Sequence, residues 1–214
     1  MIKYLLVVFA YLLGSIPFSY LLGKIFKGQD IRKLGSGNLG TTNAFRCFGK
    51  PIGFAVLFAD TLKSGVIVFL LVNTTWFDSL SLFHPLVYGF ASVLGHVFPI
   101  WFKFKGGKGV ATSFGLLLTY NFWVGLGMAL AFLITEYITR YVSVSSTVAS
   151  IIAVITVTLM HFFVVPDLYL MIITGIATAL IIFRHRSNYK RLKLGTENRV
   201  KLFDKLDRLL VKNK

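Results

Sequence analysis

The sequence predicts an all-α integral membrane protein, a bundle of seven transmembrane helices, and three observations support that fold class. The chain of 214 residues is 56% hydrophobic and only 14% charged, with a mean hydropathy of +0.74, whereas soluble domains carry about 25% charged residues. Its apolar residues form runs long enough to cross a bilayer. Its 23 Lys and Arg side chains lie mostly between and after those runs, which indicates anionic lipid headgroups and cytoplasmic loops rather than nucleic acid.

The first apolar run, 4–26, is predicted to be a transmembrane helix. It is too long for the apolar part of a signal peptide, lacks a small-x-small cleavage site, and ends with Lys24 and Lys27. Pro17 is expected to bend it. The later runs at 51–72, 83–102, 142–165 and 167–183 are each predicted to form one further helix.

The apolar segment at 110–138 decides on which side of the membrane the tail lies. If it crossed once, the tail after Phe183, with eleven Lys or Arg, would lie opposite the loop at 27–50, which holds five. Separating these two basic segments would break the positive-inside bias. We therefore predict a hairpin of two short helices, 108–120 and 121–138, turning near Tyr120 and Asn121.

The whole chain, 1–214, is then one membrane domain of seven helices, with its N-terminus outside and its C-terminus inside. The basic tail, 184–214, ends in a segment with Leu202, Phe203, Leu206, Leu209 and Leu210 at helical spacing and cations on the other face. That pattern is typical of an amphipathic helix on the inner leaflet. An ordinary solvated end fits it equally well.

The first polar motif is K-L-G-S-G-N-L-G-T-T-N-A-F-R, residues 33–46. Glycines at 35, 37 and 40 permit positive φ angles, and successive N–H groups in such turns form an anion-binding nest. Ser36, Asn38 and the residues from 41 to 43 add neutral hydrogen-bonding groups, and Arg46 adds a guanidinium suited to phosphate. A solvated turn is the alternative, and the motif alone does not decide between them.

The second motif, residues 95–112, places Gly106, Gly107, Lys108 and Gly109 at the start of a helix. The N-terminal amides of a helix favour a phosphate. The motif is not a nucleotide-binding Walker A loop, because Gly109 replaces the Ser or Thr that follows the lysine. The alternative is a basic helix start anchored to lipid headgroups. His96, in the preceding apolar run, is expected to hydrogen-bond to the backbone.

The third motif, residues 184–197, follows the last apolar run. His185 and Asn188 are three residues apart and so share one helix face. A stop-transfer cluster would explain the cations around them but not this pair. Within the spans, Asp60 and Lys63 can neutralise one another, and a functional and a structural role are equally compatible with them. Arg140 and Ser143, at the cytoplasmic edge, could add to an anion site.

Several classes of site are excluded by what the sequence lacks. The cytoplasmic segments hold no pair of carboxylates that could bind Mg²⁺. The single cysteine, Cys47, cannot form an internal disulfide or a metal cluster. Neither His96 nor His185 is followed at the fifth position by the aspartate of a common acyltransferase signature. The sequence therefore predicts no metal, no cofactor and no nucleic-acid partner.

Taken together, G-S-G-N-L-G-T-T-N-A-F-R, G-H-V-F-P…F-K-G-G-K-G-V-A-T and H-R-S-N-Y-K-R-L-K-L-G-T-E resemble the cytoplasmic motifs of the PlsY family. These are bacterial acyl-phosphate:glycerol-3-phosphate acyltransferases, and the likeness spans nearly the whole chain. Thr41 and Tyr189 differ from the residues common in the family. The resemblance implies transfer of a fatty acyl group from acyl-phosphate to the 1-hydroxyl of glycerol 3-phosphate, which gives lysophosphatidic acid and phosphate. It also implies a multi-pass protein of the bacterial cytoplasmic (inner) membrane with its active site facing the cytoplasm.

From the motifs and the resemblance we expect three groups of site residues. The catalytic residues are Ser36, Arg46, Lys108, His185 and Asn188. The substrate-binding residues are Gly35, Gly37, Asn38, Thr42, Asn43, Gly106, Gly107, Gly109, Arg140 and Ser143. The structural residues are Glu197, Asp60 and Lys63. An acyl-phosphate is already activated, so no covalent acyl-enzyme is needed, and either His185 or a substrate phosphate could take the proton of the hydroxyl.

The expected partners are the two substrates, membrane lipid and, more remotely, other enzymes of phospholipid synthesis. A second hypothesis is a membrane transporter for a small phosphorylated anion. A transporter needs polar access from both sides of the membrane, whereas all three motifs are predicted to lie on the cytoplasmic side. The acyltransferase hypothesis is therefore favoured.

Overall fold

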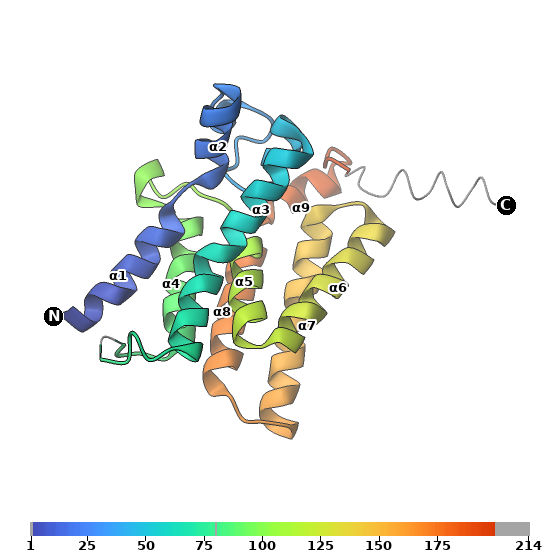
Figure 1. Ribbon diagram of the computed structural model, residues 1–214. Helices are drawn as coiled ribbons and strands as arrows, with labels where there is room; N and C mark the ends of the chain where they lie inside the picture. Colours follow the sequence, from blue (N-terminus) through green and yellow to red (C-terminus); the bar gives the residue numbers. More distant parts are fainter. Residues whose placement is uncertain (1, 80, 200–214) are drawn as a thin grey trace.

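The computed structural model describes residues 2–79 and 81–199, and within those ranges every regular element is helical (Figure 1). The predicted all-α fold class is confirmed. The α-helices are α1 (Ile2–Ser15), α2 (Phe18–Lys27), α3 (Thr41–Asn73), α4 (Pro85–Val97), α5 (Val110–Tyr120), α6 (Phe122–Thr139), α7 (Val142–Phe163), α8 (Leu168–Arg184) and α9 (Arg186–Lys193). Two short 3₁₀ helices, η1 (Ile31–Lys33) and η2 (Ile100–Phe102), lie in the loops that follow α2 and α4.

The first predicted helix is broken into two. α1 and α2 meet at a bend of 42°, at Ile16 and Pro17, because proline cannot donate a backbone hydrogen bond. α1 has 14 residues and is therefore about 21 Å long, shorter than a bilayer core. α2 ends in Lys24 and Lys27 and exposes Ile25 and Phe26. The predicted run 4–26 is thus a short apolar helix followed by an amphipathic one.

Helix α3 begins ten residues earlier than the predicted run 51–72 and folds back on itself. Gly49 has a non-helical backbone, with φ 81° and ψ −176°. The hydroxyl of Thr41 donates to a carboxylate oxygen of Asp60 at 3.5 Å, although 19 residues of straight helix would separate them by roughly 28 Å. The first two turns of α3, which carry the end of the first polar motif, therefore pack against the middle of the same helix.

The predicted hairpin is present. α5 ends at Tyr120 and α6 begins at Phe122, and the side chain of Asn121 between them accepts from the backbone N–H of Val124. Among the described residues, four helices are long and apolar enough to cross a membrane, or up to six if each bent pair counts once, and α5 is a shorter apolar helix. The count of seven crossings and the side of each terminus remain predictions.

The helices pack closely through small residues, as is typical of membrane bundles. Gly14 of α1 lies against the backbone of Ser92 in α4, and Gly95 of α4 lies against the backbone of Tyr11. The outer faces carry large apolar side chains: Phe163 is 80% exposed and Trp123 is 76% exposed. A surface this apolar fits lipid rather than water.

The segments that carry the three motifs gather at one end of the bundle, with α2, the first part of α3 and α9 at the top of Figure 1. The connections from α3 to α4, α5 to α6 and α7 to α8 lie at the other end (Figure 1) and contain no Lys or Arg. This is the grouping of loops that the charge distribution predicts. The amphipathic helix expected near the C-terminus lies almost wholly at 200–214, outside the described residues.

Candidate active site

The first polar motif is held together by Asn43, which lies on the first turn of α3. Its side-chain amide donates to the carbonyls of Leu34 at 3.1 Å and Asn38 at 3.0 Å, and its oxygen accepts from the backbone N–H of Ser36 at 3.0 Å. Asn43 is 2% exposed. The side chain of Asn43 therefore uses its hydrogen-bonding groups within the loop and stabilises the conformation of the loop. Gly35 and Gly37 have the positive φ angles, 55° and 69°, that the motif predicts.

The first and second motifs are in direct contact. The side chain of Asn38 donates to the carbonyl of Gly106 at 3.3 Å. Arg184, the last residue of α8, donates to the carbonyls of Gly106 at 3.1 Å and Gly107 at 3.3 Å. The second loop is therefore hydrogen-bonded both to the first motif and to the start of the third.

The backbone N–H groups of Gly106 and Gly107 in the second loop are both hydrogen-bonded within the protein. The N–H of Gly106 donates to the carbonyl of Val97, and the N–H of Gly107 donates to the carbonyl of His96. Both acceptors lie at the C-terminal end of α4, which the loop passes as it leads to α5. These two N–H groups are therefore not directed at an anion, and the role of Gly106 and Gly107 in substrate binding stays a prediction. Gly109, with φ 86°, is the N-cap of α5.

Lys108 joins the second motif to the third. Its ammonium donates to the side-chain oxygen of Asn188 at 2.6 Å. The amide nitrogen of Asn188 donates to one oxygen of Glu197 at 2.7 Å, and Arg191 donates to the other oxygen at 2.7 Å. Asn188 is 6% exposed, so this chain of charge-assisted hydrogen bonds fixes the position of the lysine.

The surroundings of Lys108 are strongly cationic. Burial lowers the pKa of Lys108 from 10.5 to about 8; Glu197 opposes this shift, while Arg191, Arg184 and Arg46 add to it. Arg46 is exposed on α3 and lies near enough for its positive charge to lower the pKa of Lys108. Ser36 is also exposed. Lys108 and the three arginines outnumber Glu197, the one acid that acts on Lys108 here, and such an excess of positive charge is suited to bind an anion.

His185 lies between α8 and α9 and is 2% exposed. Its Nδ1 is 2.8 Å from the carbonyl of Ile181, which can only accept, so Nδ1 carries the proton and Nε2 is left as an acceptor. Burial, Lys108 and Arg184 lower the pKa of His185 to about 4 against the partial opposition of the Ile181 hydrogen bond. The imidazole is therefore neutral at physiological pH.

Three further candidates lie at the end of α6 and on the first turns of α7 and α3. Arg140, with φ 64°, ends α6, and its guanidinium lies 4.9 Å from the ring of Tyr137. Ser143 is buried on the first turn of α7. Tyr141, between these two residues, lies under the guanidinium of Arg199 at 5.7 Å from the ring centroid, and the role of Arg140 and Ser143 in substrate binding stays a prediction. Thr42 lies on the first turn of α3, beside the first loop.

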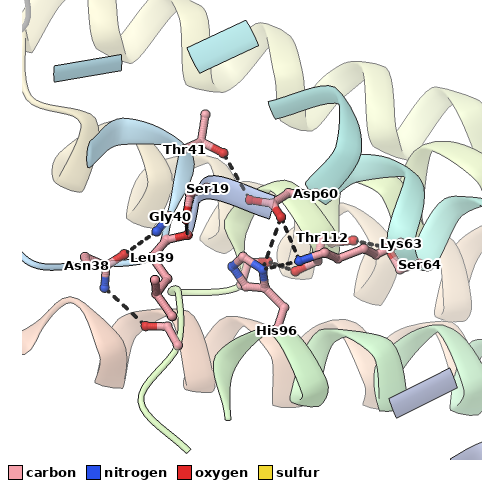
Figure 2. Close-up of polar contacts among 12 residues, drawn as sticks. Ser19, Asn38, Leu39, Gly40, Thr41, Asp60, Lys63, Ser64, His96 and Thr112 are labelled. Carbon is pink, nitrogen blue, oxygen red and sulfur yellow. Dashed lines mark hydrogen bonds and ion pairs between the residues drawn. The ribbon is translucent and has the colours of Figure 1, made fainter. Parts of the chain in front are cut away.

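Asp60 and Lys63 lie inside the bundle with His96 (Figure 2). The ammonium of Lys63 is 2.8 Å from Oδ1 of Asp60 and 3.3 Å from Nδ1 of His96. The ring of His96 thus contacts side chains, where we expected a backbone partner. The carboxylate is an intramembrane charge that only a nearby cation could offset.

Sequence reasoning missed three charged residues. Arg184 and Arg191 were counted only as cations of a basic cluster, although Arg184 holds the second loop and Arg191 holds Glu197. Glu136 is 1% exposed in α6, and the hydroxyl of Ser145 donates to it at 2.8 Å. An acid within the apolar run 121–138 was a visible signal of a buried polar contact.

Known proteins resemble this chain in sequence and in fold. A family model described as glycerol-3-phosphate acyltransferase matches residues 4–195. The glycerol-3-phosphate acyltransferase of Bacillus subtilis (strain 168) is 47% identical over 197 residues, which cover 92% of this chain and 97% of that protein. The enzyme of the same name from Staphylococcus carnosus (strain TM300) is 43% identical over 201 residues, covering 92% and 97%.

Two crystal structures of PlsY (YgiH), an integral membrane glycerol 3-phosphate acyltransferase, share the fold. The glycerol 3-phosphate form has a TM-score of 0.82 and 38% identity, covering 95% of this chain and 98% of that one. The lysophosphatidic acid form has a TM-score of 0.78 and 37% identity, covering 92% and 94%. On its motifs, its fold and these matches, the chain belongs to the glycerol-3-phosphate acyltransferase family of integral membrane proteins.

Proposed function

We propose that this protein transfers a fatty acyl group from acyl-phosphate to the 1-hydroxyl of glycerol 3-phosphate, producing lysophosphatidic acid and phosphate. The observation that carries the proposal is the meeting of three polar segments at Lys108, whose ammonium contacts Asn188 and whose neighbours Arg46, Arg184 and Arg191 are all cationic. Both substrates are phosphates, and such a cluster would hold them. The solved relatives with glycerol 3-phosphate and lysophosphatidic acid support the same acceptor and product.

Each residue of the site has a role that follows from its chemistry. Lys108 and the exposed Arg46 supply positive charge for the phosphate groups, and the hydroxyl of Ser36 supplies a neutral hydrogen bond beside them. Asn188 and Glu197 hold the lysine. Asn38, Asn43 and the glycines shape the loops that present these groups. Such an arrangement lowers the barrier by positioning two anions that would otherwise repel one another and by stabilising developing charge.

The reaction itself needs no covalent acyl-enzyme. The 1-hydroxyl oxygen attacks the carbonyl carbon of the acyl-phosphate, a C–O bond forms, and the bond from that carbon to the phosphate oxygen breaks. The hydroxyl proton passes to a phosphate oxygen, so that hydrogen phosphate leaves. We assign the proton to the substrate phosphate because the lowered pKa of His185, about 4, makes that imidazole a weak base at neutral pH.

The site would face the cytoplasm. Within the described residues, the segments at the motif-bearing end of the bundle (Figure 1) contain most of the Lys and Arg residues, and cytoplasmic loops are enriched in such residues. Glycerol 3-phosphate would enter from that side, and the acyl chain would lie among the helices of the inner leaflet of the bacterial cytoplasmic membrane.

The test is a comparison of acyl donors. Purified protein in detergent receives labelled glycerol 3-phosphate with palmitoyl-phosphate, palmitoyl-CoA or palmitoyl-acyl carrier protein, with and without EDTA. We expect lysophosphatidic acid from palmitoyl-phosphate alone, with equal rates in EDTA. Lys108→Ala in the same detergent is the inactive control. Folded protein that forms product from palmitoyl-CoA, or that forms none from palmitoyl-phosphate, would contradict the proposal.

A further inference from the structure

We propose that His96, held by Asp60 and Lys63, is a positioning residue that supports the loop of Lys108 from the bilayer side and thereby sets the affinity for glycerol 3-phosphate. The inference rests on the proposed function, in which this loop carries a phosphate-binding lysine. His96 lies on α4, ahead of the loop in sequence, and takes no direct part in the chemistry proposed above.

The cluster that holds His96 is almost completely buried. Asp60 is 1% exposed, Lys63 is 3% exposed and His96 is 7% exposed. The ammonium of Lys63 contacts the other two, at 2.8 Å from the carboxylate and 3.3 Å from the imidazole (Figure 2). Because both contacts end on the same ammonium, the ring of His96 cannot move without disturbing a buried ion pair.

The contacts determine which ring nitrogen carries the proton. An ammonium can only donate, so Nδ1 of His96, at 3.3 Å from Lys63, accepts. The separation of 3.6 Å between Nδ1 and Asp60 is too long for a hydrogen bond. The proton therefore lies on Nε2, and this N–H is turned toward the second loop.

The second loop rests directly on this ring. A Cβ atom placed on Gly107 would meet Nε2, Cε1 and Cδ2 of His96 before any other atom. The backbone N–H of Gly107 also donates to the carbonyl of His96 at 3.0 Å. Gly107 does not have a positive φ, so a side chain there is excluded by the imidazole and not by the backbone conformation.

The same cluster also supports the first polar motif. The second oxygen of Asp60 accepts from the hydroxyl of Thr41, the first residue of α3. Lys63, His96, Leu39 and Gly107 line one small cavity beneath the two loops. One buried cluster therefore lies under both loops, and a change in the ring of His96 is transmitted to the residue next to Lys108.

The test is a double-mutant cycle between His96→Ala and Gly107→Ala, read as the KM for glycerol 3-phosphate. Gly107→Ala alone is expected to raise that KM by about tenfold or more, because the new methyl group would overlap the imidazole of His96 and displace the residue next to Lys108. In the double variant the space left by the imidazole admits the new methyl group. The KM should then return to within about threefold of the His96→Ala value, with the KM for acyl-phosphate unchanged throughout.

Matched controls separate positioning from general damage. Gly127→Ala on α6, where a Cβ meets nothing within 4 Å, should combine additively with His96→Ala. His96→Gln with Gly107→Ala repeats the cycle if His96→Ala is unstable. Additive KM effects of the His96 and Gly107 changes, or equal shifts in both substrate KM values, would overturn the inference. If the wild-type protein forms no product, the proposed function fails, and the same cycle read as the melting temperature still tests the contact.

Discussion

At the scale of single residues, the pKa of His185 bears on which group takes the proton. Its Nε2 is free to accept, but a pKa of about 4 leaves it a poor base near pH 7. A general base contributes about 10²–10⁴-fold to a rate. We therefore expect His185→Ala to keep kcat within about tenfold of the wild type in steady-state assays. A loss of a hundredfold or more in folded protein would instead assign the proton to the histidine.

Lys108 should set the alkaline limit of activity. Burial and the surrounding arginines lower its pKa to about 8, so the ammonium is charged below that pH and loses its charge above it. Since the phosphate of the substrate keeps its charge across this range, kcat/KM for glycerol 3-phosphate should fall as the pH rises through 8. Lys108→Arg, which stays charged, should be less active but independent of pH from 7.5 to 9.5. A wild-type profile that stays flat to pH 10 would contradict this assignment.

Glu197 should act through the residues that it holds. Glu197→Ala removes the partner of both Asn188 and Arg191, and hydrogen bonds to charged groups contribute about 1.5–3 kcal/mol each. We expect kcat/KM to fall by about tenfold to a hundredfold, because Asn188 no longer fixes Lys108. Asp78→Ala, on an exposed loop at the other end of the bundle, is the control and should have normal kinetics. If Glu197→Ala and Asp78→Ala had equal kinetics, the hydrogen bonds of Glu197 to Asn188 and Arg191 would not be needed for activity.

At the scale of helices, the sequence predicted the elements better than their ends. Apolar runs located the helices, and the distribution of charge correctly predicted the hairpin that turns between Tyr120 and Phe122. The fold-back of α3 was not predictable in this way, because hydropathy does not distinguish a straight helix from two segments that pack on one another. Gly49 and Pro51 in the sequence indicate that the helix is interrupted, but they do not indicate in which direction the chain turns there.

The fold-back can be tested at Gly49. Its backbone, φ 81° and ψ −176°, lies in a region that essentially only glycine adopts, and strain there costs on the order of 1–3 kcal/mol. Gly49→Ala should therefore lower the melting temperature in detergent. Gly175→Ala on α8 is matched to it, since a Cβ meets nothing within 4 Å at either position, and should leave the melting temperature unchanged or higher. Equal melting temperatures would mean that the turn at Gly49 tolerates a side chain.

At the scale of the whole molecule, the three motifs were correctly expected to lie at one end, because charge distribution and membrane geometry decide this together. The partners of individual groups were not predictable. Nothing in the residue types indicates that the amides of Gly106 and Gly107 are used by α4, or that Asn43 braces its own loop. These hydrogen bonds depend on the backbone conformation of the loops, which the sequence motifs do not specify. They distinguish the residues that shape the site from the residues that can still bind substrate.

The orientation in the membrane is the remaining whole-molecule prediction, and α5 is its critical point. With 11 residues, α5 is about 17 Å long, short of a bilayer core of about 30 Å. The exposed Trp123 just after the turn suits the membrane interface. If the α5–α6 turn reaches the outer surface, seven crossings place the α9 end in the cytoplasm with the basic loops. If the turn stops within the bilayer, the hairpin is re-entrant.

Single cysteines in a Cys47→Ser background distinguish these cases. With an impermeant maleimide on intact cells, we expect Asp78→Cys and Phe122→Cys to be labelled directly, and Lys193→Cys only after permeabilisation. All three native residues are exposed, so protection would reflect the membrane and not packing. Protection of Phe122→Cys in both conditions would indicate a re-entrant hairpin. Labelling of Lys193→Cys in intact cells would put the cationic end of the bundle outside, away from glycerol 3-phosphate, and contradict the cytoplasmic site.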